Sequence, residues 1–188
     1  PSWHDSLDFD ANYALHVDRL SRAARILDAH GIRFGLEFLG PKTLRNNHPY
    51  EFIHTLDGML ALCRDIEHAA GTRNMGLLLD AYHWYTAGGT LDQLARLRDA
   101  DIVDVHVNDA LPGIPLDELP DTHRALPGET GVIDLRGFLQ ALARLGRQSV
   151  RHPHQVGFLA PGGFTTASGE TAGPRKTVRQ PLASARRR

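Results

Sequence analysis

The sequence has almost no cysteine: Cys63 is the only one in 188 residues. A single thiol excludes an intramolecular disulfide framework and any cysteine-rich zinc site. The chain also lacks an apolar run of about 18 residues, the length that a membrane span requires, and it does not open on a signal peptide. We therefore expect a cytoplasmic protein with no membrane partner. Its first residue is Pro1 rather than methionine, so we expect a fragment or a clipped gene model.

The chain has no excess of charge of one sign, because its net charge is -1. The charge is nevertheless uneven. Residues 147–188 contain eight basic residues and one acid, Glu170, so this segment carries +7 and residues 1–146 carry -8. Such a contrast predicts a domain over 1–146 followed by an irregular basic tail over 147–188. Arginine clusters attract phosphate, but scattered arginines with only Phe158 and Phe164 as aromatics predict no nucleic-acid partner.

Apolar periodicity predicts an alternation of helices and strands over the first 146 residues. Helices are expected over residues 12–30, 51–70, 90–98 and 135–145, and strands over 32–38, 75–79 and 102–107. Short, nearly continuous apolar strands between amphipathic helices are typical of a parallel sheet covered by helices. The fold class is therefore α/β.

The three predicted strands share one feature, a side chain able to bind metal at or near the C-terminal end. These residues are Glu37, Asp80 and His106. Catalytic groups of a TIM barrel collect at that end of the strands, so the pattern favours a barrel over a doubly wound sheet. A complete barrel has eight strand–helix units and about 250 residues. Three strands and four helices predict a partial (β/α)8 TIM barrel, its C-terminal half.

Two carboxylates and one imidazole are donors that suit Mn²⁺ or Mg²⁺, and Co²⁺ or Zn²⁺ would also fit. Each residue has another interpretation. Glu37 could be a solvated carboxylate at a strand end, Asp80 could cap a helix or turn, and His106 could be a core histidine. Asn108 and Asp109, which follow the third strand, are expected to cap a loop. Four histidines on the predicted helices are expected at the surface (His16, His30, His54 and His68).

Four segments in order carry a resemblance to a known family: 35–42 (GLEFLGPK), 79–84 (LDAYHW), 105–110 (VHVNDA) and 124–131 (RALPGETG). Over about residues 12–146 the chain resembles the xylose isomerase-like TIM barrel family, and more narrowly its sugar phosphate isomerase/epimerase branch. Members of that branch act on a small-molecule sugar or sugar phosphate. Proton transfer next to a carbonyl proceeds there through a metal-stabilised enediolate.

The resemblance also implies roles for individual residues. Glu37 would be both a metal ligand and the catalytic acid or base, with Asp80 and His106 as further ligands. His83 would act in catalysis by contacting substrate oxygens, and Arg124 would bind substrate in the same pocket. For His83 and Arg124 a structural role is an equally open interpretation. Mn²⁺ is the metal expected.

The sequence departs from the family pattern after Gly146. The family has one more strand there with a second catalytic glutamate, whereas Glu170 has no apolar run before it. We therefore expect the last strand to be missing, the tail to be disordered or frame-shifted, and the activity to be impaired. The alternatives are a non-catalytic remnant that binds metal or sugar, and a phosphodiesterase of the apurinic endonuclease type. The open strand edges of a half-barrel would favour a homo-oligomer.

Overall fold

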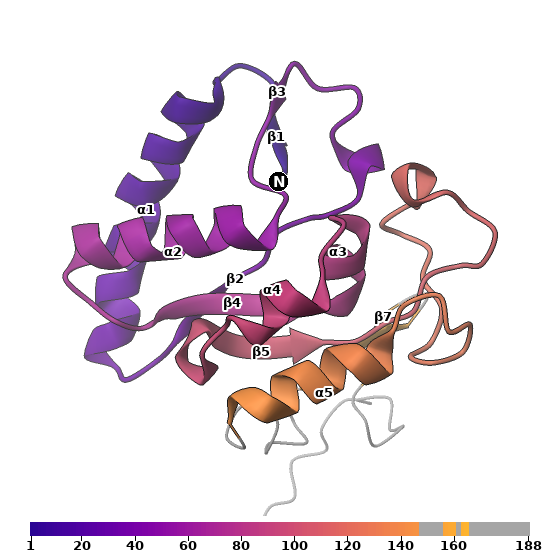
Figure 1. The fold of residues 1–188 in the computed structure, drawn as a ribbon. Coiled ribbons are helices and arrows are strands. Elements are labelled where there is room, and N and C mark those ends of the chain that lie inside the picture. The colour runs from indigo at the N-terminus through magenta and orange to yellow at the C-terminus, as the bar shows by residue number, and fades with distance from the viewer. Residues whose placement is uncertain (147–155, 161–162, 166–188) are drawn as a thin grey trace, which may run out of the picture.

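The computed structural model describes residues 1–146, 156–160 and 163–165 (Figure 1). Its main element is a five-stranded sheet with the strand order β2-β4-β5-β6-β7. The strands are β2 (Phe34–Leu36), β4 (Met75–Asp80), β5 (Ile102–His106), β6 (Val156–Ala160) and β7 (Gly163–Thr165). The first four are parallel, and β7 returns antiparallel to β6.

The order of the parallel strands distinguishes a barrel from a doubly wound sheet. A doubly wound sheet reverses its strand order at a switch point, whereas here each strand lies beside the next parallel strand along the chain. Right-handed crossovers then place the connecting helices on one face. Figure 1 shows α2, α4 and α5 around one side of β4 and β5, and this arrangement confirms the partial (β/α)8 barrel.

The prediction that no strand follows Gly146 is wrong. β6 pairs in parallel with β5, and Val156 and Gly157 lie opposite Val105 and His106. Its sequence, Val-Gly-Phe-Leu-Ala, contains no acidic residue, so β6 occupies the place of the next barrel strand without a carboxylate. Strands β6 and β7 lie within the segment predicted as the tail. Its other residues, Glu170 among them, lie outside the described part of the chain.

The helices begin and end where the local sequence supplies caps. They are α1 (Phe9–Ala29), α2 (Leu56–Ala70), α3 (Ala81–Thr86), α4 (Leu91–Ala95) and α5 (Leu135–Leu145). The helix predicted from residue 51 starts five residues later, because the Thr55 side chain accepts from Gly58 N. Thr90 caps α4 in the same way, by accepting from Gln93 N. At the other end of α2, Gly71 takes a left-handed conformation with φ 70°.

Several short elements had no counterpart in the sequence-based prediction. β1 (Trp3–His4) and β3 (Tyr50–Glu51) form a separate two-stranded antiparallel pair. In the described part of the chain, 3-10 turns cover Lys42–Leu44, Asp99–Asp101 and Leu116–Glu118. No helix among the described residues is long and apolar enough to cross a membrane.

The core lies between the sheet and its helices. Leu77 and Leu79 of β4 are fully buried, as are Ile66 of α2 and Phe138 of α5. α1 packs on α2, α2 on β4, and α4 on α5. This packing fixes the carboxyl ends of β2, β4 and β5 relative to one another, and the polar side chains of the predicted site lie at those ends.

Candidate metal centre

Asp80, the last residue of β4, has two roles at once. Its Oδ1 accepts from the backbone N–H of Tyr82 at 2.7 Å, so it caps α3. Its Oδ2 faces the other way and accepts from Arg124 Nη1 at 2.8 Å. The residue is fully buried. The helix-cap interpretation of Asp80 is therefore correct for one oxygen, and the second oxygen belongs to the polar cluster.

His106 ends the neighbouring strand and lies directly opposite Asp80 in the sheet register. Its Nδ1 is 3.9 Å from Asp80 Oδ2 and 4.0 Å from Glu37 Oε1. On the other side of the ring, Nε2 is 4.0 Å from Asp104 Oδ2. The three strand-end residues predicted to meet do meet, and the ring presents Nδ1 to both carboxylates.

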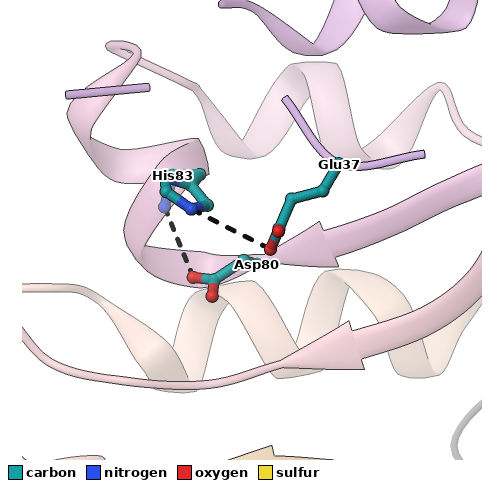
Figure 2. A group of neighbouring side chains, drawn as sticks. All are labelled: Glu37, Asp80 and His83. Atoms are coloured by element: carbon teal, nitrogen blue, oxygen red, sulfur yellow. Dashed lines mark hydrogen bonds and ion pairs between the residues drawn. The ribbon is translucent and has the colours of Figure 1, made fainter. Parts of the chain in front are cut away.

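Glu37 follows β2 directly, and its carboxylate reaches toward Asp80 and His83 (Figure 2). Burial raises the pKa of Glu37 to about 7, and the negative charge of Asp80 adds to this effect while Arg124 opposes it. A carboxyl group with a pKa close to neutral can take up and release a proton at ordinary pH.

His83 lies on α3, three residues after Asp80, with its side chain 3% exposed. Its Nε2 is 3.9 Å from Glu37 Oε1, the contact drawn in Figure 2. Burial lowers the pKa of His83 to about 4, and the positive charge of Arg124 contributes to this effect although Asp80 opposes it. The ring is therefore neutral at physiological pH.

Arg124 closes the cluster from the loop that follows β5. Its Nη1 donates to Asp80, as described above. Its Nη2 donates to Asp121 Oδ1 at 2.7 Å and lies 3.2 Å from His83 Nε2. Its guanidinium also lies 4.4 Å above the ring centre of Tyr82, a cation–π arrangement. Sequence reasoning missed Asp121. The signal available was its spacing of three residues from Arg124, which the structure uses for an ion pair.

The donor atoms are spaced as a metal site requires. Glu37, Asp80 and His83 offer ligand atoms within 4.8 Å of one another, the one such group found among the described residues. His106 Nδ1 adds a fourth donor at 3.9–4.0 Å from the two carboxylates. Two bonds of about 2.1 Å to a central Mn²⁺, Mg²⁺ or Zn²⁺ ion span up to about 4.2 Å, which accommodates the separations of His106 from the two carboxylates. Carboxylates outnumber the single guanidinium, so the charge balance also favours a cation.

Two neighbouring predictions have definite outcomes. Asp109 caps a loop as expected, because its carboxylate accepts from the backbone N–H of Ala110, Thr130, Gly131 and Ile133.

The expectation of a surface position is wrong for His16. Its ring packs on Phe52 with centroids 4.8 Å apart, and it lines an apolar cavity of about 180 Å³ that Glu37 also borders.

The comparison with protein families decides the affiliation. The family model described as "Xylose isomerase-like TIM barrel" matches residues 1–151. The chain belongs to this family. The expectation drawn from the four motif segments is thereby confirmed, and the matched range contains all five residues of the predicted site.

The family member resembles inosose isomerases in sequence. It is 29% identical over 134 residues to inosose isomerase of Bacillus subtilis, a match covering 71% of this chain and 44% of that protein. It is 30% identical over 131 residues to inosose isomerase of Bacillus velezensis, a match covering 70% of this chain and 42% of that protein. The chain thus spans less than half the length of the curated relatives it matches.

Solved structures agree on the fold. A xylose isomerase domain protein from Alicyclobacillus acidocaldarius superposes with a TM-score of 0.63 at 35% identity, over 76% of this chain and 49% of that one. The IOLI protein, whose crystal structure holds a zinc atom, superposes with a TM-score of 0.61 at 25% identity. This match covers 78% of this chain and 48% of that one. Together with the donor cluster, the zinc-containing neighbour supports a divalent metal for the family member described here.

Proposed function

We propose that the chain is part of a divalent-metal-dependent sugar isomerase or epimerase that transfers a proton next to a carbonyl group. The observation that carries the proposal is the position of Glu37. A carboxyl group with a pKa of about 7 lies within 4.0 Å of His106 Nδ1, at the end of the sheet where barrel enzymes place catalysis.

Glu37, Asp80 and His106 would hold the metal. The ion, Mn²⁺ in this proposal, supplies Lewis acidity toward the carbonyl and the neighbouring hydroxyl oxygen of an open-chain sugar or an inosose. Zn²⁺ is the alternative, because it is the ion bound in the IOLI protein.

The chain's own residues would handle the proton and the substrate. Glu37 takes the proton from the carbon between the two oxygens and keeps it on its carboxyl group until it is returned. His83, on α3, and Arg124, on the loop that follows β5, would hold substrate oxygens. Arg124 is already oriented by Asp121 and by the Tyr82 ring, so it needs little reorganisation to bind a substrate oxygen.

A second candidate function has a specific observation in its favour. β6 lies where the family carries its second catalytic glutamate, yet its sequence holds no carboxylate. A chain with one proton-transferring group could bind metal and sugar without completing the reaction. The phosphodiesterase alternative requires several zinc ions, and one metal-binding group is found among the described residues.

The test is solvent exchange, which needs only one base. The full chain is incubated with Mn²⁺ and an inosose in D₂O, and the proton signals beside the carbonyl are followed by NMR. We expect these protons to exchange for deuterium, with the rate falling about 100-fold or more in Glu37→Gln. Glu118→Gln, which changes an exposed carboxylate on a 3-10 turn, is the matched control and should exchange like the parent. No exchange in the folded, metal-loaded chain would reject the proposal in favour of the non-catalytic candidate.

A further inference from the structure

Two loops that are far apart in the sequence meet beside the metal centre. The loop after β2 carries Glu37 and then the 3-10 turn Lys42–Leu44. The loop after β5 carries the turn Leu116–Glu118 and then Arg124. The two turns pack against each other. A side chain that joins these loops therefore connects the segment of the proton-transferring carboxyl group with the segment of the guanidinium.

Two contacts join the turns, and they differ in exposure. Lys42 Nζ lies 2.6 Å from Asp117 Oδ2, but the two side chains are 46% and 66% exposed. Ion pairs as exposed as this one contribute little, because water and salt screen them. Thr43 Oγ1 donates to the carbonyl oxygen of Leu119 at 3.0 Å in partly buried surroundings, and Leu119 itself is buried. The hydrogen bond from Thr43 is therefore the contact that water replaces less easily.

The chain that follows Leu119 has little conformational freedom. Thr43 holds the carbonyl oxygen of Leu119, and the ring of Pro120 fixes its own φ angle. The carbonyl oxygen of Pro120 accepts from Tyr82 Oη at 2.5 Å. Two consecutive peptide planes are thus anchored, the first from the loop after β2 and the second from α3. The second plane contains the backbone nitrogen of Asp121, so both anchors determine where Asp121 lies.

Asp121 in turn determines where Arg124 lies. Its carbonyl oxygen accepts from Arg124 Nε at 3.1 Å, and its Oδ1 accepts from Nη2 at 2.7 Å. Both bonds come from one residue, so a displacement of Asp121 moves the guanidinium with it. Asp80 Oδ2 holds the remaining nitrogen, Nη1, at 2.8 Å. The position of Arg124 therefore depends on the two anchors that precede Asp121.

We propose that Thr43 is a positioning residue, which acts through Leu119 and Asp121 to set the place of the Arg124 guanidinium relative to Glu37. The consequence for a sugar rests on the function proposed above, whereas the coupling of Thr43 to Arg124 does not. Because small misplacements of reacting groups weaken catalysis strongly, the coupling keeps the group that binds substrate in register with the group that moves the proton.

The first test is spectroscopic and uses the full chain labelled with ¹⁵N-arginine, without metal or sugar. Nuclear Overhauser contacts to the Tyr82 ring, whose centre lies 4.4 Å from the guanidinium carbon, identify the Nε–H signal of Arg124. Thr43→Val replaces the hydroxyl by a methyl group of similar size. We expect the Arg124 N–H to exchange with water about 5-fold faster in this variant, the factor that one ordinary hydrogen bond contributes. Thr43→Ser restores the hydroxyl and should restore slow exchange.

Lys42→Gln is the matched control, because it changes the adjacent side chain of the same turn and breaks only the exposed ion pair. Its Arg124 signal should equal that of the parent chain. Unchanged exchange in a folded Thr43→Val chain, or equally fast exchange in Lys42→Gln, would overturn the proposal. If Thr43→Val does not fold, Thr43→Ala takes its place with the same two outcomes.

A kinetic readout separates positioning from a purely structural role. In the deuterium-exchange assay with Mn²⁺ and an inosose, Thr43→Val should need about 5-fold more sugar for the half-maximal rate, with the rate at saturation close to that of the parent. A lower saturated rate with an unchanged half-saturating concentration would overturn the proposal. Absence of exchange in the parent chain would reject the proposed function alone, because the Arg124 signal is measured without sugar.

Discussion

At the scale of single residues, Glu37 is the group whose surroundings alter its chemistry most usefully. Burial and the nearby charge of Asp80 bring its pKa from 4.5 to about 7. The surroundings therefore favour the neutral form of this carboxyl group in the folded chain. Since a pKa shift is also a difference in proton binding between the folded and unfolded states, it makes stability depend on pH.

The sign of this dependence follows from the direction of the shift. The folded pKa of Glu37 lies above the unfolded one, so its contribution to stability is fully present below about pH 4.5 and is lost as pH rises through 7. We expect the Tm of the metal-free chain to fall relative to that of Glu37→Gln between pH 5 and pH 8. Thermal unfolding in EDTA, followed by circular dichroism, measures the Tm of the parent chain and of Glu37→Gln. Parallel Tm curves for the two proteins would show that Glu37 has an ordinary pKa.

A second prediction at this scale concerns Arg124, because both side chains of its ion pair with Asp80 are buried. The two side chains are 6% and 0% exposed. Removing the guanidinium leaves a buried carboxylate uncompensated, so Arg124→Ala should lose about 3–5 kcal/mol of unfolding free energy. The matched control is Arg98→Ala, which breaks an ion pair with Asp101 from a side chain 73% exposed and should cost less than about 1 kcal/mol. Urea unfolding measures both, and similar losses would contradict the buried-pair interpretation.

At the scale of elements, the loop between β5 and α5 is organised by one carboxylate. Asp109 is fully buried and accepts backbone N–H groups from both ends of that loop. Burial alone would raise its pKa, but hydrogen bonds from Ile133, Gly131 and Ala110 hold the pKa of Asp109 below its ordinary value. The same loop carries Arg124 and Asp121, so its order determines the geometry of the metal centre.

A substitution at Asp109 should therefore loosen the whole loop. Asp109→Ala leaves buried N–H groups without an acceptor, at about 1–3 kcal/mol for each group that water does not reach. We expect faster hydrogen exchange at the amides of Thr130, Gly131 and Ile133 and a lower Tm. Asp117→Ala, on an exposed turn of the same loop, should change neither. Unchanged exchange in the Asp109 variant would mean that the loop is held by other contacts.

The sequence predicted those elements whose pattern is local. The long helices and three strands follow from apolar periodicity, and the caps at Thr55 and Thr90 sharpen their starts. α3 was missed because its six residues complete fewer than two turns, and it is held by the Asp80 cap and by packing of Trp84 on Phe138. β1 and β3 are two residues long and exist through their pairing alone.

At the scale of the whole molecule, the parts that sequence reasoning missed depend on tertiary contacts. β6 is an apolar run of five residues whose place is set by pairing with β5, which no periodicity reveals. In the site, strand ends predicted Glu37, Asp80 and His106 because parallel strands bring their carboxyl ends together. The hydrogen bond from Gly40 N–H to His83 Nδ1 could not be predicted, since it depends on the close approach of the segment after β2 to α3.

The most direct measurement of the central claim is calorimetric titration of the full chain with Mn²⁺. We predict saturable binding that is abolished in both Glu37→Ala and His106→Ala, because their ligand atoms lie 4.0 Å apart in one site. His68→Ala, on the exposed end of α2, should bind as the parent does. Binding that survives either ligand substitution, or no binding by a folded parent chain, would contradict the claim that these strand ends form a divalent metal centre.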